Sequence, residues 1–175
     1  MVKLLNKKIG ILGGSFDPAH NGHLALSKIA IKKIGLNKIY WIVTKKNPLK
    51  NKSHFPLNER LKLAKKMVKN INKIQVLYLD KIIKSSRSIN TINYLIKKKK
   101  MKNIYFIIGS DILTELHRWK SWKKIVKLTK LIVFYRKGYG RKNKNTIVAK
   151  YLNNKNILYI NNKPIKISST VLRNK

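Results

Sequence analysis

The chain has 175 residues, of which 42 are Lys or Arg and 5 are Asp or Glu, so its formal net charge is +37. A chain of this length suits one domain, in which roughly 70% of the unfolded surface becomes buried. The lack of Cys excludes disulfides, thiolate nucleophiles and cysteine-held zinc. No apolar run is long enough to span a membrane. We therefore expect a single soluble, cytoplasmic domain over residues 1–175.

The excess of positive charge has two interpretations. Only six of the 42 basic residues are Arg, and the many Lys occur together with many Ile and Asn, all of which have A/T-rich codons. Compositional drift would scatter such residues over the surface, whereas selection for nucleic-acid binding concentrates Arg and aromatic residues on one face. We favour drift, and in either case we expect the positive field to attract anionic substrates.

The hydrophobic pattern alternates between short strands and helices. Six apolar runs rich in β-branched or aromatic residues are expected to be strands: 8–12, 38–44, 74–79, 104–108, 131–135 and 157–160. Six helices are expected after them: 24–34 with Gly35 as its stop, 57–71, 88–101 with Ser88 as its cap, 112–116, 122–128 and 146–153. This order predicts an α/β fold, a Rossmann-like doubly wound parallel sheet with helices on both faces. Ligands of such sheets bind at the carboxyl ends of the strands.

The segment that follows the first strand combines groups suited to binding phosphate. Gly13 and Gly14 permit close approach of a ligand and unusual dihedral angles. His20 and His23 lie three residues apart, so at the N-terminus of a helix they would point to one side, above free backbone N–H groups. Two imidazoles in that place can donate hydrogen bonds to phosphate oxygens whose negative charge grows during a reaction.

The same residues also have structural interpretations. A Gly-Gly pair after a strand is common in turns, and His-x-x-His without a third ligand nearby does not indicate a protein zinc site. Asp17 and Asp111 each lie beside a glycine-containing turn, which is notable in a chain with so few carboxylates. Asp17 could bind turn amides, and Asp111 could cap the helix that follows it.

Four motifs resemble one enzyme family. Residues 13–23, Gly-Gly-Ser-Phe-Asp-Pro-Ala-His-Asn-Gly-His, resemble the GG(T/S)FDPxHxGH signature of nicotinate-nucleotide adenylyltransferases, in the HxGH nucleotidyltransferase superfamily. Residues 167–173, Ile-Ser-Ser-Thr-Val-Leu-Arg, resemble the second superfamily signature, ISSTxxR. Residues 106–111 and 131–139 are also similar to the family, in the same order. The family usually continues into a further helix after ISSTxxR, whereas two residues follow it here, so a shortened nucleotidyltransferase domain is expected.

The resemblance implies transfer of AMP from ATP to nicotinate mononucleotide, giving deamido-NAD and pyrophosphate in NAD biosynthesis. The implied cofactor is Mg²⁺, bound through the ATP phosphates and without metal ligands from the protein. His20 and His23 would be the catalytic residues that contact the phosphates. The other implied ATP-binding residues are Gly13, Gly14, Ser15, Phe16, Gly22, Gly109, Asp111, Ser168, Ser169, Thr170 and Arg173. The implied substrate-binding residues are Trp119, which would stack on the pyridine ring, and Ser88, Thr91, Lys46 and Arg136.

Some residues depart from the family pattern, and two other functions stay open. Arg87 and Asn90 stand where the family has an aromatic and an acidic residue, and Trp122 is expected to be the buried core tryptophan. Pantetheine-phosphate adenylyltransferase shares the fold and both signatures, but it typically has Thr at the position of His20. A non-catalytic basic protein that binds polyanions could also keep this fold. The expected partners are ATP and nicotinate mononucleotide, with no specific nucleic acid and no membrane, and a homo-oligomer is left open.

Overall fold

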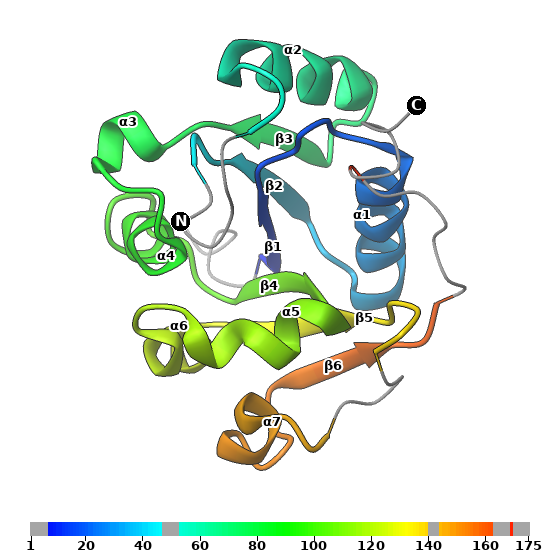
Figure 1. Ribbon diagram of the computed structural model, residues 1–175, viewed down its shortest axis with the longest axis vertical. Helices are drawn as coiled ribbons and strands as arrows, with labels where there is room; N and C mark the ends of the chain where they lie inside the picture. The colour runs from blue at the N-terminus through cyan, green and yellow to red at the C-terminus, as the bar shows by residue number, and fades with distance from the viewer. Residues whose placement is uncertain (1–6, 47–52, 140–143, 163–168, 170–175) are drawn as a thin grey trace.

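Six parallel strands form one sheet in the computed structural model, which describes residues 7–46, 53–139, 144–162 and 169 (Figure 1). The strands are β1 (Ile9–Gly14), β2 (Lys38–Val43), β3 (Ile74–Leu77), β4 (Ile104–Gly109), β5 (Lys130–Phe134) and β6 (Ile157–Ile160). Their order in the sheet is β3-β2-β1-β4-β5-β6, and every neighbouring pair is parallel. The predicted doubly wound sheet is confirmed, and each predicted strand lies within two residues of an observed one.

Helices cover both faces of the sheet, as expected. They are α1 (Asn21–Ile34), α2 (Leu57–Val68), α3 (Asp80–Ile83), α4 (Ser88–Lys97), α5 (Ser110–Glu115), the 3-10 turn η2 (Leu116–Arg118), α6 (Trp122–Leu128) and α7 (Ile147–Tyr151). Helices α1 and α2 pack on one face through Ala30 and Ala64, around Trp41. Helices α4, α5, α6 and α7 pack on the other face. None of the helices in the described part of the chain is long and apolar enough to cross a membrane.

Several local predictions are settled by backbone geometry. Gly35 ends α1 in the left-handed conformation, with φ 69°, and its amide donates to the carbonyl of Ile31, so the predicted stop is confirmed. Ser88 is not a cap, because it is already the first helical residue of α4. The buried tryptophan is Trp41, with 0% exposure, in β2. Trp122 is only partly buried at the start of α6, so its predicted core role is wrong.

The strand order opens a crevice beside the first strand. The chain moves outward from β1 to β2 and β3, and then returns to place β4 on the other side of β1. Connections therefore leave β1 and β4 in opposite directions, and the carboxyl ends of these two strands border the point where a doubly wound sheet binds its ligand. Gly14 and Gly109 are the last residues of these two strands.

Candidate active site

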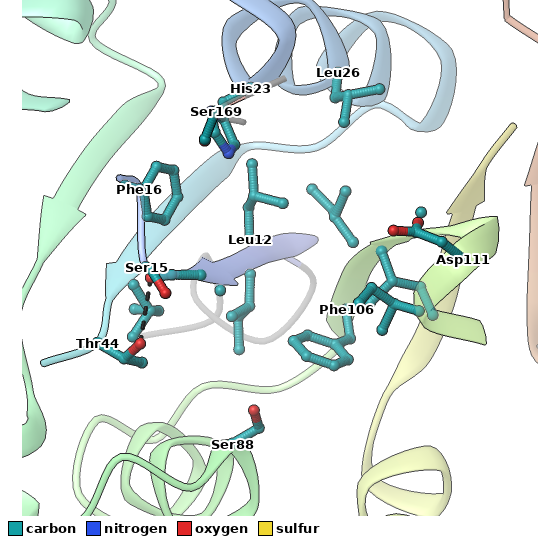
Figure 2. A pocket seen from close by; sticks show the side chains of 18 of the residues that line it. Leu12, Ser15, Phe16, His23, Leu26, Thr44, Ser88, Phe106, Asp111 and Ser169 are labelled. Carbon is teal, nitrogen blue, oxygen red and sulfur yellow. Dashed lines mark hydrogen bonds between the residues drawn. The ribbon is translucent and has the colours of Figure 1, made fainter. Parts of the chain in front are cut away.

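A large cleft lies at the carboxyl ends of β1 and β4, where the fold predicts a ligand. Its volume is about 1250 Å³. Pockets for one small ligand hold roughly 300–1000 Å³, so this cleft has room for two bound nucleotides. Figure 2 shows His23 and Ser169 on one side of it, Ser88 on the opposite side, and Asp111 near the end of β4.

The two predicted catalytic histidines form the beginning of α1. The backbone amide of Gly22 donates to Nδ1 of His20 at 3.0 Å, and the amide of His20 donates to Nδ1 of His23 at 3.2 Å. The ring centroids are 3.9 Å apart, and both residues line the cleft. Because Nδ1 of each ring accepts a hydrogen bond, the proton of each neutral ring is on Nε2. Each histidine therefore keeps one N–H donor that these contacts do not use.

Burial keeps both imidazoles neutral. It lowers the pKa of His20 to about 4, helped by the positive charge of Arg136. It lowers the pKa of His23 to about 3, with further lowering by His20 and Arg136. Burial has this effect because it penalises the charged form of the ring. At neutral pH the pair therefore offers polarised N–H donors and no resident positive charge.

Aromatic packing fixes the ring of His23 from behind. The ring of Phe16 lies 4.6 Å from that of His23 and stacks on Trp41 at 5.1 Å. The indole N–H of Trp41 donates to Oγ of Ser27 at 2.8 Å, and the Ser27 hydroxyl donates to the carbonyl of His23 at 2.9 Å. Phe16 is 2% exposed, so it supports the histidine pair at the inner wall of the cleft.

Of the two roles expected for the glycines of the first motif, the structure contradicts only the unusual dihedral angles. Neither Gly13 nor Gly14 has a positive φ, and the left-handed residue in this loop is Phe16, with φ 48°. A Cβ at Gly13 would come no closer than 4.0 Å to Phe106, and one at Gly14 no closer than 3.8 Å to Phe16. The fold therefore tolerates a methyl group at both positions. Because both glycines line the cleft, such a methyl group would take up space in it.

An ion pair borders the cleft at the end of β4. Nη1 of Arg136 lies 2.5 Å from Oδ2 of Asp111, and both residues line the cleft. The other carboxylate oxygen, Oδ1, is buried and has no hydrogen-bond partner among the residues that the structure describes. A Cβ at Gly109 would collide with that oxygen, so a larger residue there would displace the Asp111 carboxylate from its present position. An unsatisfied buried acceptor is costly, and a hydroxyl of a bound ligand would satisfy it.

The second motif reaches the first one through Ser169. Its hydroxyl donates to the carbonyl of Pro18 at 3.0 Å, and Ser169 lines the cleft. The predicted phosphate-binding residues Ser168, Thr170 and Arg173 lie outside the described residues.

Most predicted substrate-binding residues gather around the same cleft. Trp119 follows η2 and packs edge-on against Phe106, with ring centroids 6.2 Å apart. Trp119, Ser88, Thr91 and Arg136 all line the cleft. Lys46 is exposed beyond the end of β2 and is not among the lining residues. The cleft thus joins residues that are far apart in the sequence.

The sequence prediction missed other residues of the cleft. Arg87 and Arg118 line it, together with Thr44 at the end of β2. A signal for the two arginines was present, because Arg is rare in a chain whose basic residues are mostly Lys. Asp17 lines the cleft but binds the backbone amides of His54 and Phe55 at 2.7 and 2.8 Å. It thus contacts backbone amides, as expected, and these two partners lie 37 and 38 positions further along the chain.

The charges of the cleft suit an anionic ligand. Its arginines and lysines outnumber its two carboxylates, Asp17 and Asp111, both of which are already engaged by the protein. Within residues 7–46, 53–139 and 144–162, no three His, Asp or Glu side chains are grouped so that they could hold a metal ion. The arrangement can therefore bind and neutralise phosphate groups with N–H donors and cations.

Comparisons with known proteins show the family and the fold of the chain. The cytidylyltransferase-like family matches residues 11–175. A probable nicotinate-nucleotide adenylyltransferase of Pelagibacter ubique is 46% identical over 166 residues, which are 95% of this chain and 92% of that protein. The nicotinic acid mononucleotide adenylyltransferase of Plasmodium falciparum has a similar fold in its complexes with NaAD and with APC. The TM-scores are 0.74 and 0.77, the identities 21% and 20%, and each comparison covers 97% of this chain and 83% of the other.

Proposed function

This chain belongs to the nicotinate-nucleotide adenylyltransferases, nucleotidyltransferases of NAD biosynthesis, and we propose that its cleft binds ATP and nicotinate mononucleotide side by side for direct adenylyl transfer. The observation that carries the proposal is the neutral histidine pair at the start of α1, with both Nδ1 atoms already bonded. In this reaction a phosphate oxygen of nicotinate mononucleotide attacks the α-phosphorus of ATP. The bond to the β-phosphate oxygen breaks, and pyrophosphate leaves.

The protein's part in this reaction is positioning and charge stabilisation. Nε2–H of His20 and Nε2–H of His23 donate to phosphate oxygens of ATP, and these hydrogen bonds strengthen as charge moves onto the leaving pyrophosphate. Gly13 and Gly14 leave space for the nucleotide, and Ser15 adds a hydroxyl. No covalent intermediate with the enzyme is part of this proposal.

The two nucleosides are assigned to different parts of the cleft. We assign the ATP ribose to Asp111, because its buried Oδ1 has no partner within the described part of the chain and a sugar hydroxyl can donate to it. We assign the pyridine ring to Trp119, because an electron-poor ring stacks well on an indole. Ser88 and Thr91 on α4 line the cleft as well and can bind polar groups of the same substrate.

Mg²⁺ fits this site only through the substrate. The cleft carboxylates Asp17 and Asp111 are engaged by backbone amides and by Arg136, so the metal would be held by the ATP phosphates that the histidines orient. When bound, Mg²⁺ neutralises charge on those phosphates.

The location of the protein in the cytoplasm stays a prediction, and the lack of cysteine is compatible with it. The oligomeric state stays open.

Pyrophosphate release tests the proposal. The protein is supplied with MgATP and, in separate reactions, nicotinate mononucleotide, nicotinamide mononucleotide or phosphopantetheine. We expect the fastest release with nicotinate mononucleotide. Preference for phosphopantetheine would instead favour the pantetheine-phosphate enzyme, and no release with any acceptor would contradict adenylyl transfer.

The role of the histidine pair is tested in the same assay. His20→Asn and His23→Asn are each expected to lower kcat on the order of 100-fold, since removing one donor to a transition-state oxyanion costs about this much. His117→Gln is the matched control, because His117 belongs to η2 and is not among the residues that line the cleft. Wild-type turnover in His20→Asn or His23→Asn would refute the assigned role.

A further inference from the structure

One arginine is almost completely buried behind the cleft. Arg60 lies in the first turn of α2 and is 1% exposed. Its guanidinium donates four hydrogen bonds to backbone carbonyls. Nε donates to Phe55 at 3.0 Å, and Nη2 donates to Lys45 at 3.0 Å. Nη1 donates to Ser15 at 2.6 Å and to Thr44 at 2.8 Å.

These four carbonyls belong to three segments that are separate in the sequence. Ser15 follows β1, Thr44 and Lys45 follow β2, and Phe55 precedes α2. Ser15 and Thr44 line the cleft, whereas Arg60 is not among the lining residues. Arg60 therefore holds together, from behind, the wall that faces the proposed ATP phosphates.

Two carboxylates add bonds to these segments, Asp17 from the loop after β1 and Asp80 from the start of α3. Asp17 accepts from the amides of His54 and Phe55, and Oδ2 of Asp80 accepts from the amide of Lys45 at 2.7 Å. Only 5 residues of the chain are Asp or Glu, and two of them are used here. Burial lowers the pKa of Arg60, while Asp17 and Asp80 raise it. An arginine stays protonated under such conditions.

The geometry of the side chain explains why this position needs arginine. A guanidinium is a planar fork with five N–H donors that point in fixed directions, whereas a lysine ammonium is a single point with three donors. A lysine at position 60 can bind one or two of the carbonyls but cannot span all three segments. This need is consistent with the composition, because Arg60 is one of only six arginines in a chain whose other 36 basic residues are Lys.

We propose that Arg60 is a positioning residue for adenylyl transfer, which fixes the loop after β1 and the end of β2 at the separation required by the ATP phosphates. The inference rests on the proposed function, since it assumes that this wall binds those phosphates. Small displacements of a positioned reactant slow a reaction strongly, by about 100-fold for roughly 1 Å. Looser coupling of the three segments should therefore affect ATP binding and turnover more than the binding of the second substrate.

The test compares Arg60→Lys with a control on the same helix. Ala64→Gly lies one turn further along α2, at a residue with 0% exposure, and it should lower the melting temperature without touching the four carbonyls. For both variants we would measure the melting temperature, kcat, both KM values, and the Kd of a non-hydrolysable ATP analogue by calorimetry. Assays are run well below the lower melting temperature, so that both variants are folded.

Arg60→Lys is expected to lower kcat about 10-fold or more and to weaken binding of the ATP analogue about 10-fold, because the wall is no longer fixed. The KM for nicotinate mononucleotide should change by less than about twofold, since the four hydrogen bonds of Arg60 go to segments other than Trp119 and α4. Ala64→Gly should lose thermal stability but keep wild-type kcat and Kd. If Arg60→Lys, while folded, keeps wild-type kcat and analogue affinity, or follows Ala64→Gly in every readout, the proposal is overturned.

A second variant covers the case in which Arg60→Lys does not fold. Asp80→Ala keeps Arg60 but removes the acceptor for the amide of Lys45 and a negative charge that acts on Arg60. It should raise the Kd of the ATP analogue about threefold or more, in line with the loss of one hydrogen bond to a charged group. Unchanged affinity in that variant would count against the proposal. If wild-type protein releases no pyrophosphate with any acceptor, the proposed function fails instead, and the analogue affinities still report on the wall.

Discussion

The hydroxyl of Ser169 donates a hydrogen bond to the carbonyl oxygen of Pro18, 3.0 Å away, although 151 positions separate them in the chain. Pro18 belongs to the motif that follows β1, and Ser169 to the motif near the C-terminus. Pro18 precedes His20 by two positions, and Ser169 lines the same cleft as the histidine pair, on the side where Figure 2 shows His23. The contact brings the two motifs into one site, as a bipartite phosphate site requires.

Loss of that contact should weaken ATP binding selectively. Ser169→Ala removes one neutral hydrogen bond, which is worth about 1 kcal/mol, and we expect the KM for ATP to rise about fivefold. The KM for nicotinate mononucleotide should stay near its wild-type value. Steady-state kinetics with each substrate varied in turn would measure both. Ser121→Ala is the control, because Ser121 is exposed, has no side-chain cap bond and is not a lining residue; an equal effect of both variants would contradict the prediction.

Gly13 should matter for the ligand and not for the fold. The space around it accepts a Cβ, so Gly13→Ala is expected to leave the melting temperature unchanged or slightly raised. The methyl group would occupy the cleft, and the Kd of a non-hydrolysable ATP analogue should rise about 10-fold or more, as expected when a buried contact is overpacked. Calorimetry and thermal unfolding would measure the two effects.

Gly35 provides the opposite case as a control. Gly35 ends α1 with a φ of 69°, and a Cβ added to it would have no atom within 4 Å. Gly35→Ala should destabilise the fold by about 1 kcal/mol, because L-residues disfavour this conformation, with the ATP-analogue affinity unchanged. A loss of stability in Gly13→Ala with normal affinity would reverse the assignment of the two glycines.

The two tryptophans that follow α5 should differ in their effect on substrate binding. Trp119→Ala removes the proposed platform for the pyridine ring, and the KM for nicotinate mononucleotide should rise about 10-fold or more while the KM for ATP changes little. Trp122 packs edge-on against Tyr151, with centroids 5.0 Å apart, and does not line the cleft. Trp122→Ala should therefore lower stability with both KM values retained. The reverse pattern in the steady-state kinetics would move the pyridine site away from Trp119.

The free energy of unfolding should fall when the pH is lowered below neutrality. His20 and His23 have pKa values of about 4 and 3 in the folded protein, below the ordinary value of 6.5. Between pH 6.5 and about 4 the unfolded chain binds protons that the folded chain does not, so each histidine can remove up to about 1.4 kcal/mol per pH unit. Above pH 6.5 both states are neutral at these positions, and their contribution is constant.

Urea unfolding at pH 7.5 and pH 5.0 would measure this effect. The lower value stays above the ordinary pKa of Asp and Glu, of which the chain has only 5, so the histidines dominate the difference. The double variant His20→Asn, His23→Gln should lose less stability between the two pH values than the wild type. An equal loss in both proteins would show that other groups take up the protons.

The periodic features of the fold could be predicted from the sequence. The contacts between residues far apart in the sequence could not. Six strands were recognisable because each is a short apolar run that ends at a turn, and the alternation with helices implied the parallel sheet. The four-residue helix α3 was missed, because so short a segment carries no full period. Trp122 was mistaken for the core tryptophan because the residue type alone does not tell how deeply a tryptophan is buried. Trp41 lies in a central strand, whereas Trp122 lies at the start of a helix.

What the sequence by itself determined is the chemistry available at the site: the glycine-histidine motif after β1, its family and the place of the ligand at the carboxyl ends of the strands. These follow from local spacing, which the chain carries wherever it folds. Only the tertiary structure decided that Phe16 and Trp41 fix His23, that Asp17 binds the amides before α2, and that Arg60 ties three segments together. Such contacts join residues separated by up to dozens of positions. The partners of Asp17 and Arg60 are moreover backbone groups, which leave no signature in the amino-acid sequence.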